Sequence, residues 1–242
     1  MLPAFDKFPA APLLILAAAL LAACGGGAPR ESSPKKETAA ATPAASATPG
    51  ETVPKIVAFG DSLTAGYGLS PQESYPSLLQ KMLDADGFKY EVVNAGVSGD
   101  TSAGGVRRID WSLDAGGVRF VILELGANDF LRGQPVAETR KNLAQIIERA
   151  KSRGAGVLLA GMLTTTETGR DYEIQISDAY KSLAKEYDVT LIPFFLEGVA
   201  GIDRLNQQDR VHPNAEGTKI VAATVYRYLK PMLEKDRRGD KD

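Results

Sequence analysis

Residues 55–64 read KIVAFGDSLT and join a short apolar run to a polar turn. The run from Lys55 to Phe59 has the composition of a β-strand, and Gly60 permits a sharp turn out of it. At such a turn, Ser62 would hold its hydroxyl at the end of the strand and its amide at the start of a helix. The stretch therefore predicts a strand, a turn and a helix with a serine at the junction. An alternative is that Asp61 and Ser62 only cap the helix.

The alternation of strand and helix patterns continues along the chain. Further apolar runs rich in β-branched residues predict strands at Tyr90–Asn94, Phe120–Leu125, Val157–Ala160 and Val189–Ile192. Segments with apolar residues at helical spacing lie between them, and a last such segment follows Pro213. Because right-handed crossovers place helices on both faces of a parallel sheet, this order predicts a three-layer α/β/α domain.

In a sheet of this kind, ligands bind beyond the carboxyl ends of the strands. Residues 94–101, NAGVSGDT, follow the second predicted strand, and residues 126–129, GAND, follow the third. Glycine lets the backbone approach a ligand and aim an amide hydrogen at it, and Asn128 can donate from its side chain. Each segment alone is also consistent with an ordinary loop turn.

His212 is the only histidine of the chain, and Asp209 stands three residues before it. A turn there would bring the carboxylate onto one ring nitrogen and leave the other to accept a proton. The alternative is a solvated polar loop. Acyl transfer needs a nucleophile, a base, a group that orients the base, and donors for the developing oxyanion. The three strand ends and this loop together supply all four.

Four segments, in this order, resemble the sequence blocks of the SGNH (GDSL) hydrolases: Gly60-Asp61-Ser62-Leu63, Gly99, Gly126-x-Asn128-Asp129 and Asp209-x-x-His212. The chain is most similar to the bacterial thioesterase I/lysophospholipase and arylesterase branch. The resemblance implies a flavodoxin-like fold with a central five-stranded parallel sheet. It also implies a carboxylic ester hydrolase that needs no metal and no organic cofactor.

The same resemblance implies a role for each site residue. Ser62 would be the nucleophile, His212 the general base and acid, and Asp209 the group that orients His212. The oxyanion hole would comprise the backbone amides of Ser62 and Gly99 and the side chain of Asn128. The expected reaction is hydrolysis of an ester through an acyl-enzyme on Ser62.

Ala127 and Arg210 stand where the family often has glycine. Neither change removes a catalytic atom, so both bear on the substrate: Ala127 would narrow an acyl pocket, and Arg210 would change the loop or attract an anionic group. The expected substrate is a small-molecule or lipid acyl ester, including lysophospholipids and thioesters. The alternatives are a carbohydrate O-deacetylase of the same family and a non-catalytic flavodoxin-like binding lipoprotein.

The charge pattern bears on the partners. The net charge is −2 at pH 7, and the basic residues are mixed with acidic ones rather than gathered in a stripe. This pattern argues against a nucleic-acid partner. We expect a monomer.

The first residues have the pattern of an export signal. Lys7 precedes an apolar run, Leu13–Leu21, that is roughly half as long as a membrane span. The run leads into Leu-Ala-Ala-Cys, which resembles the lipobox of bacterial lipoproteins and makes Cys24 the expected lipidation site. The alternative is an ordinary secretory signal with an incidental cysteine. We expect a signal peptide over residues 1–23.

Residues 24–54 are rich in Ala, Thr, Pro and Ser and contain no aromatic residue, which predicts a disordered, lipid-anchored linker. The hydrolase domain would then occupy residues 55–242. Such an anchor would hold the domain in the bacterial cell envelope, on the periplasmic side. Gly25 follows Cys24 in place of the aspartate that often signals inner-membrane retention, which favours the outer membrane.

Several aromatic side chains have two interpretations. They would line an acyl groove or belong to the core, and the core is the commoner place for aromatic residues at such spacings. We therefore expect core positions for Tyr67, Tyr75, Trp111, Phe130, Phe194 and Phe195.

Overall fold

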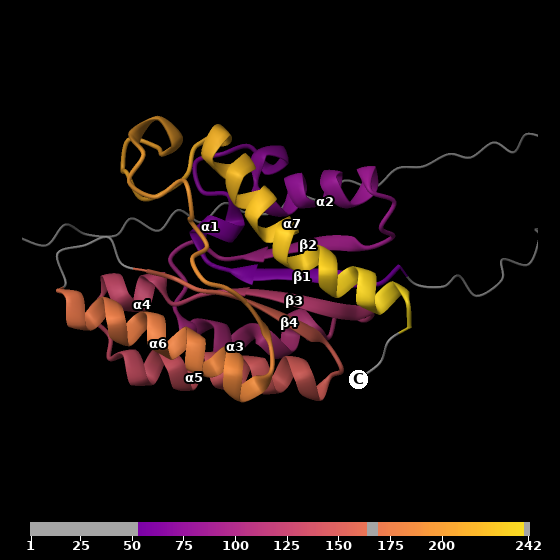
Figure 1. The fold of residues 1–242 in the computed structure, drawn as a ribbon, viewed down its shortest axis with the longest axis horizontal. Helices are drawn as coiled ribbons and strands as arrows, with labels where there is room; N and C mark the ends of the chain where they lie inside the picture. The colour runs from indigo at the N-terminus through magenta and orange to yellow at the C-terminus, as the bar shows by residue number, and fades with distance from the viewer. Residues whose placement is uncertain (1–52, 164–168, 240–242) are drawn as a thin grey trace, which may run out of the picture. The chain divides into compact units, whose positions relative to one another are not determined.

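The computed structural model describes residues 53–163 and 169–239. Five parallel strands form one sheet in the order β2-β1-β3-β4-β5, the flavodoxin-like order, which confirms the expected fold (Figure 1). The strands are β1 Lys55–Gly60, β2 Glu91–Gly96, β3 Val118–Glu124, β4 Gly156–Ala160 and β5 Thr190–Ile192. All five predicted strands occur, with ends that differ by up to two residues from the sequence pattern.

Helices cover both faces of the sheet, so the three-layer prediction is also confirmed (Figure 1). One layer holds α2 (Tyr75–Ala85) and α7 (Ala215–Arg237), which contact each other. The other holds α3 (Ser102–Leu113), α5 (Val136–Ser152) and α6 (Arg170–Tyr187), in which α5 contacts both neighbours. Short helices α1 (Ser62–Ala65) and α4 (Ala127–Leu131) follow β1 and β3, and 3₁₀ turns occur at Pro71–Glu73 and Asp203–Leu205.

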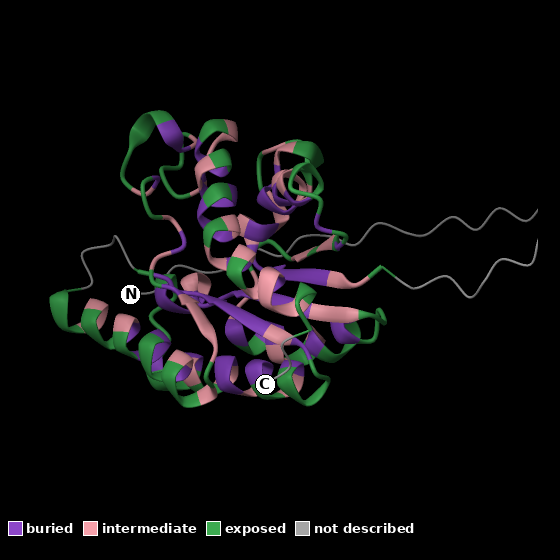
Figure 2. Cartoon of the chain, turned by 45° about the vertical axis from the view of Figure 1, so that its right-hand side comes forward, coloured by how far each residue is buried: buried purple, intermediate pink, exposed green. Residues whose placement is uncertain are grey.

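The central strands are buried because helices pack on both of their faces. In β1 every residue from Ile56 to Gly60 is buried, and in β3 the run Phe120–Glu124 is buried, whereas the edge strand β2 is only partly covered (Figure 2). Each large apolar side chain buried in this way contributes roughly 1.5–3 kcal/mol. Continuous apolar runs such as these are typical of parallel strands that are buried on both faces.

The register of the sheet determines where the candidate site lies. Gly60 at the end of β1 is paired with Gly96 of β2 on one side and with Glu124 of β3 on the other. The three strands therefore end at the same level. The segments that follow them, which carry Ser62, Gly99 and Asn128, leave the sheet side by side.

The last helix and α5 begin and end as the sequence indicates. Asn214 caps α7, because its side chain accepts hydrogen bonds from the amides of Glu216 and Gly217. The apolar face of α7 packs inward, with Val221, Val225 and Leu229 buried. Gly154 follows the last residues of α5 with φ 76°, the left-handed conformation expected of a glycine that ends a helix.

The aromatic residues divide between core and surface. Tyr75 and Phe195 are fully buried and their rings stack edge to face, as expected for core residues. Trp111 is 79% exposed on α3, so the core prediction is wrong there; its position on α3 faces solvent rather than the sheet. Tyr67 is also exposed.

Some predictions fall on parts of the chain that have no description. The expected signal peptide, Cys24 and nearly all of the expected linker lie outside the described residues. Among the helices of residues 53–163 and 169–239, none is long and apolar enough to cross a membrane.

Candidate active site

Ser62 lies at a tight junction between β1 and α1. Asp61 caps α1, since its Oδ1 accepts a hydrogen bond from the Leu63 amide at 3.0 Å. As the first residue of α1, Ser62 has an amide that the helix itself leaves without a partner. A side chain at Gly60 would place its Cβ 2.1 Å from Oγ1 of Thr64, so only glycine fits before this turn.

His212 links Ser62 to Asp209. Its Nε2 lies 2.9 Å from Oγ of Ser62, and its Nδ1 lies 2.7 Å from Oδ2 of Asp209. The other oxygen of Asp209 accepts hydrogen bonds from the amides of Val211 and His212, at 2.9 and 3.0 Å. Partial burial raises the pKa of Asp209, but these amides and the imidazole outweigh it and lower the pKa to about 2. Asp209 is thus ionised across the physiological range.

The loop that carries His212 is fixed at both ends. An isolated antiparallel bridge joins Asn206 to Pro213, and the Gln207 amide donates to the His212 carbonyl at 2.7 Å. The Gln207 side chain reaches across to the Tyr67 carbonyl, also at 2.7 Å. The Tyr67 ring lies 4.8 Å from the imidazole, centre to centre. These contacts hold the His212 loop against the residues that follow Ser62.

The two other predicted donors lie at the neighbouring strand ends. Gly99 follows β2 with φ 78°, a conformation that favours glycine, and its amide belongs to the loop that faces Ser62. Asn128 lies in α4, directly after β3 and Gly126. Its Nδ2 donates to Oδ2 of Asp61 at 2.9 Å, which engages one of its two N–H groups and leaves the other for a ligand.

Two loop aspartates, Asp100 and Asp129, hold the backbone through hydrogen bonds. Asp129 accepts hydrogen bonds from the amide and hydroxyl of Ser102, at 2.8 and 2.5 Å, and so joins α4 to the start of α3. Asp100 accepts from the Thr101 amide and pairs with Arg108. Both carboxylates therefore fix the loops that carry Gly99 and Asn128.

A buried pair of carboxyl groups lies beneath Ser62. Glu124 Oε2 accepts hydrogen bonds from the Asp61 amide at 3.2 Å and from the Thr64 hydroxyl at 2.7 Å. Burial raises the pKa of Asp61 to about 6, although its hydrogen bonds with Leu63 and Asn128 lower it. Burial, followed by the charge of Asp61, raises the pKa of Glu124 well above its ordinary value. Two such carboxyls do not both ionise easily, so the charge of Asp61 favours the protonated form of Glu124.

Ser62, His212, Gly99 and Asn128 line one cavity of about 270 Å³ and supply polar groups to it. Asp209 does not line this cavity and contacts Nδ1 of His212. The rest of the lining is mainly apolar and includes Phe130, Leu131, Met162, Leu163, Phe194 and Leu196. Phe130 is buried, Phe194 is half-buried, and Tyr67 also lines the cavity, so for these three the acyl-groove interpretation agrees with their position.

Ala127 and Arg210, which stand where the family often has glycine, also line this cavity. Arg210 has φ 61°, a left-handed conformation that glycine adopts without strain, and its guanidinium pairs with Asp203 at 3.0 Å. Among the described residues, no group of three or more His, Cys, Asp or Glu side chains is placed to hold a metal ion.

The model of the GDSL-like lipase/acylhydrolase family matches residues 58–220, about two-thirds of the chain. The chain belongs to this family. The matched range begins in β1 and ends in α7, so it spans the sheet, the turn at Ser62 and the His212 loop.

Relatives agree with this assignment. Esterase TesA of Pseudomonas aeruginosa is 39% identical over 178 residues, which cover 74% of this chain and 89% of that protein. Thioesterase 1/protease 1/lysophospholipase L1 of Escherichia coli is 38% identical over 181 residues, which cover 75% and 86%. A crystal structure of TesA superposes with a TM-score of 0.72 at 39% identity and covers 74% of this chain and 99% of that one. The expected enzyme class, a carboxylic ester hydrolase, is therefore confirmed.

Sequence reasoning about this acylhydrolase missed three contributors to the site. The first is Glu124, whose signal was a charged residue inside an otherwise apolar strand. The second is the use of Asp61 as the acceptor for Asn128. The third is Arg108, which carried no signal because the groups it contacts are distant in the sequence.

Proposed function

We propose that the protein hydrolyses acyl esters of small molecules or lipids through an acyl-enzyme formed on Ser62. The observation that carries this proposal is the continuous hydrogen-bonded chain from Asp209 through His212 to Ser62, at 2.7 and 2.9 Å, which opens on an apolar cavity. The alternative of a non-catalytic binding protein gives no reason for this chain, because binding alone requires neither a base nor its orienting carboxylate.

In the acylation step, Asp209 accepts the Nδ1 hydrogen and so keeps the lone pair of His212 on Nε2. Nε2 removes the proton from the Ser62 hydroxyl as Oγ forms a bond to the ester carbonyl carbon. The carbonyl oxygen takes the negative charge, and the amides of Ser62 and Gly99 with the Asn128 side chain donate to it. The bond to the leaving alcohol or thiol then breaks, and that group takes the proton from Nε2.

In the deacylation step, water replaces the leaving group. His212 Nε2 removes a proton from the water as its oxygen bonds to the acyl carbon, and the same donors bind the second oxyanion. The bond between the acyl carbon and Ser62 Oγ breaks, and Oγ recovers the proton from His212. The products are a carboxylic acid and the free enzyme.

The lining of the cavity favours an acyl chain longer than acetyl. Leu131, Leu163 and Leu196 line the same cavity as Ser62 and His212 and make much of its wall apolar. An apolar pocket binds each further methylene favourably, at about 0.8 kcal/mol for full burial. We therefore propose lysophospholipids and related acyl esters or thioesters as substrates, rather than acetylated carbohydrates.

The test is hydrolysis of p-nitrophenyl esters of increasing acyl length by the wild type and by Ser62→Ala and His212→Ala variants. We expect turnover that rises beyond the acetyl ester and is lost in both variants. A rate that is greatest for acetyl would favour the carbohydrate deacetylase. Activity retained by Ser62→Ala would overturn the acyl-enzyme on this residue.

We also propose that Cys24 carries a lipid anchor and that the enzyme resides at the outer membrane of the cell envelope, facing the periplasm. The support is the Leu-Ala-Ala-Cys sequence with Gly25 after it. Growth with an alkyne-labelled fatty acid should label the wild type and leave Cys24→Ser unlabelled, and the labelled protein should fractionate with the outer membrane. Labelling of both proteins, or of neither, would contradict lipidation at this residue.

A further inference from the structure

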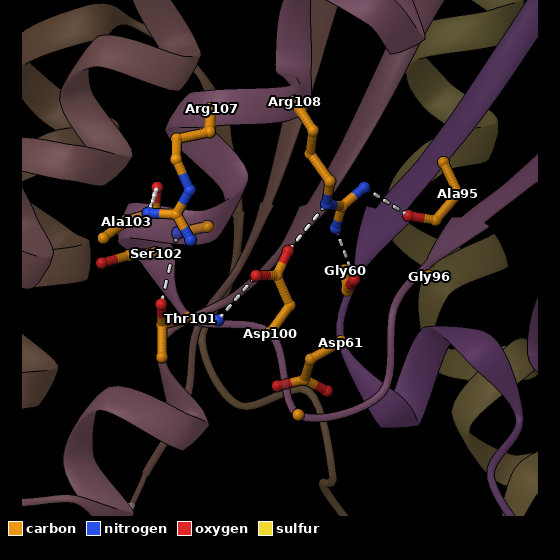
Figure 3. A network of polar contacts seen from close by, with 12 residues as sticks. Gly60, Asp61, Ala95, Gly96, Asp100, Thr101, Ser102, Ala103, Arg107 and Arg108 are labelled. Carbon is orange, nitrogen blue, oxygen red and sulfur yellow. Dashed lines mark hydrogen bonds and ion pairs between the residues drawn. The ribbon is translucent and has the colours of Figure 1, made fainter. Parts of the chain in front are cut away.

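Arg108 lies on α3 and reaches back to the ends of two strands (Figure 3). Its Nη2 donates to the Gly60 carbonyl at 2.8 Å and its Nη1 to the Ala95 carbonyl at 2.7 Å. Its Nε donates to the Asp100 carboxylate at 2.7 Å. The guanidinium also lies over the Phe59 ring, 3.9 Å from its centre. One side chain thus joins β1, β2 and the loop that follows β2.

These acceptors lie next to the two backbone donors of the proposed oxyanion hole. Gly60 is two residues before Ser62, and Asp100 directly follows Gly99. We propose that Arg108 is a positioning residue that fixes the amides of Ser62 and Gly99 relative to each other. This inference rests on the proposed function and identifies what holds its oxyanion hole in shape.

The local packing supports this role. The Arg108 and Asp100 side chains are only 20% and 12% exposed, so solvent screens their interaction weakly. Asp100 lies so close to α3 that a Cβ on Gly104 would come within 1.7 Å of its Oδ1. The second oxygen is thereby left to face Arg108, while Oδ1 accepts from the Thr101 amide at 3.0 Å. Both oxygens of the Asp100 carboxylate therefore accept a hydrogen bond, and these bonds hold the loop that carries Gly99.

Three acceptors in different directions require a planar guanidinium. Arginine offers five N–H groups in a rigid fork, whereas lysine offers one compact ammonium that cannot reach three separated acceptors with the same geometry. Arg108→Lys keeps the positive charge and loses this span. Because oxyanion donors act only when they are aimed at the developing charge, displacement of one amide lowers turnover more than it lowers substrate binding.

The neighbouring Arg107 is a matched control on the same helix. It is exposed, and its guanidinium donates to the Ala103 carbonyl of its own helix, as Figure 3 shows. The experiment compares the wild type, Arg108→Lys, Arg107→Lys and Asp100→Asn on p-nitrophenyl butyrate. Active sites are counted by the burst of p-nitrophenolate released by an ethyl p-nitrophenyl phosphonate, which would react covalently with Ser62. Rates are expressed per titrated site, so a fraction of unfolded protein does not affect them.

For Arg108→Lys we expect kcat per titrated site to fall on the order of tenfold to a hundredfold, with KM within about twofold of the wild type. The rate of phosphonate inactivation should fall in parallel, because the phosphoryl oxygen would use the same donors. Asp100→Asn should show a smaller loss, and the double variant should be no worse than Arg108→Lys alone. Arg107→Lys should match the wild type.

Other outcomes would overturn the positioning role. If Arg108→Lys shows fewer titrated sites but an unchanged kcat per site, Arg108 serves only stability. Equal losses in Arg107→Lys and Arg108→Lys would point to a general effect of charge on α3. The proposed function is tested separately by the wild type and Ser62→Ala in the same assay. An active wild type with an unaffected Arg108→Lys would overturn only the role of Arg108.

Discussion

The Ser62 side and the His212 side of the site each contain an aspartate, and the two differ in burial and charge. Asp61 is 1% exposed and its pKa lies at about 6, whereas the Asp209 side chain is 40% exposed and its pKa lies at about 2. Asp61 is enclosed at the edge of the sheet with Glu124 beneath it. Asp209 lies in a loop and accepts hydrogen bonds from that loop's own amides.

The difference in burial and charge between the two aspartates reflects what each side of the site needs. The Ser62 side needs fixed backbone and donor positions, and the sheet register with its buried hydrogen bonds provides them. The His212 side needs a permanent negative charge beside the imidazole, and the backbone amides and imidazole that contact Asp209 provide it because together they outweigh the desolvation of the carboxylate. Exchange of the two environments would weaken both functions.

The strongest test of the comparison is Asp209→Asn. Oδ1 of Asp209 is committed to two amides, so an asparagine would keep its oxygen there and turn its NH₂ toward Nδ1 of His212. That arrangement favours the wrong tautomer, and we expect kcat to fall on the order of a thousandfold to ten-thousandfold. Steady-state kinetics would measure this loss of kcat. The melting temperature should change little. Asp203→Asn, also exposed in this region, is the control and should stay close to wild type.

On the Ser62 side, Asp61→Asn should give a smaller loss. Leu63 and Asn128 donate to different oxygens of Asp61, so an asparagine would present its oxygen to one of these donors and its NH₂ group to the other. We expect kcat to fall on the order of tenfold to a hundredfold because Asn128 loses its orientation. In an Asn128→Ala background the same change should have little further effect. Additive losses in the double variant would show that Asp61 acts by another route.

The buried carboxyl pair predicts a pH dependence of stability. Since the folded-state pKa of Glu124 is raised, the folded protein holds this proton at pH values where the unfolded chain has lost it. Stability therefore falls as pH rises above about 4.5, the ordinary value, until the folded-state pKa is passed.

Glu124→Gln removes this titration. In that window, the free energy of unfolding of the variant minus that of the wild type should increase by about 1.4 kcal/mol for each pH unit. Urea denaturation between pH 5 and pH 8 would measure the gain, and the exposed Glu91→Gln should show none. A difference between Glu124→Gln and wild type that does not change with pH would mean that Glu124 ionises normally in the folded state.

The smallest expected effect concerns the backbone of the His212 loop. Arg210 adopts a left-handed conformation at φ 61°, which costs a non-glycine residue roughly 1–2 kcal/mol, partly offset by the lower chain entropy of the unfolded state. Its exposed ion pair with Asp203 contributes little. Arg210→Gly should therefore raise the free energy of unfolding by about 0.5 kcal/mol in thermal or urea denaturation. Arg210→Ala keeps the strain and should not raise it.

Much of this enzyme could be predicted from its sequence. The apolar runs predicted all five strands, and they are continuous in the central strands because side chains covered on both faces must be apolar over their whole length. The reactive residues could be predicted because the sequence offers few candidates. It has one histidine, with a carboxylate three residues before it, and a serine directly after the first strand. Parallel strands end at one edge, so Ser62, Gly99 and Asn128 were expected together without knowledge of any distance.

Only the tertiary structure decided how those groups are held. Arg108 contacts Gly60 across 48 residues of chain, and Asn128 contacts Asp61 across 67, and no local pattern encodes such pairs. The raised pKa of Asp61 also depends on burial, which follows from tertiary packing, whereas the lowered pKa of Asp209 comes from groups two and three residues away along the chain. Local sequence determined the strands, the reactive groups and the charge of Asp209, whereas the long-range contacts determined the geometry of the site and the environment of Asp61.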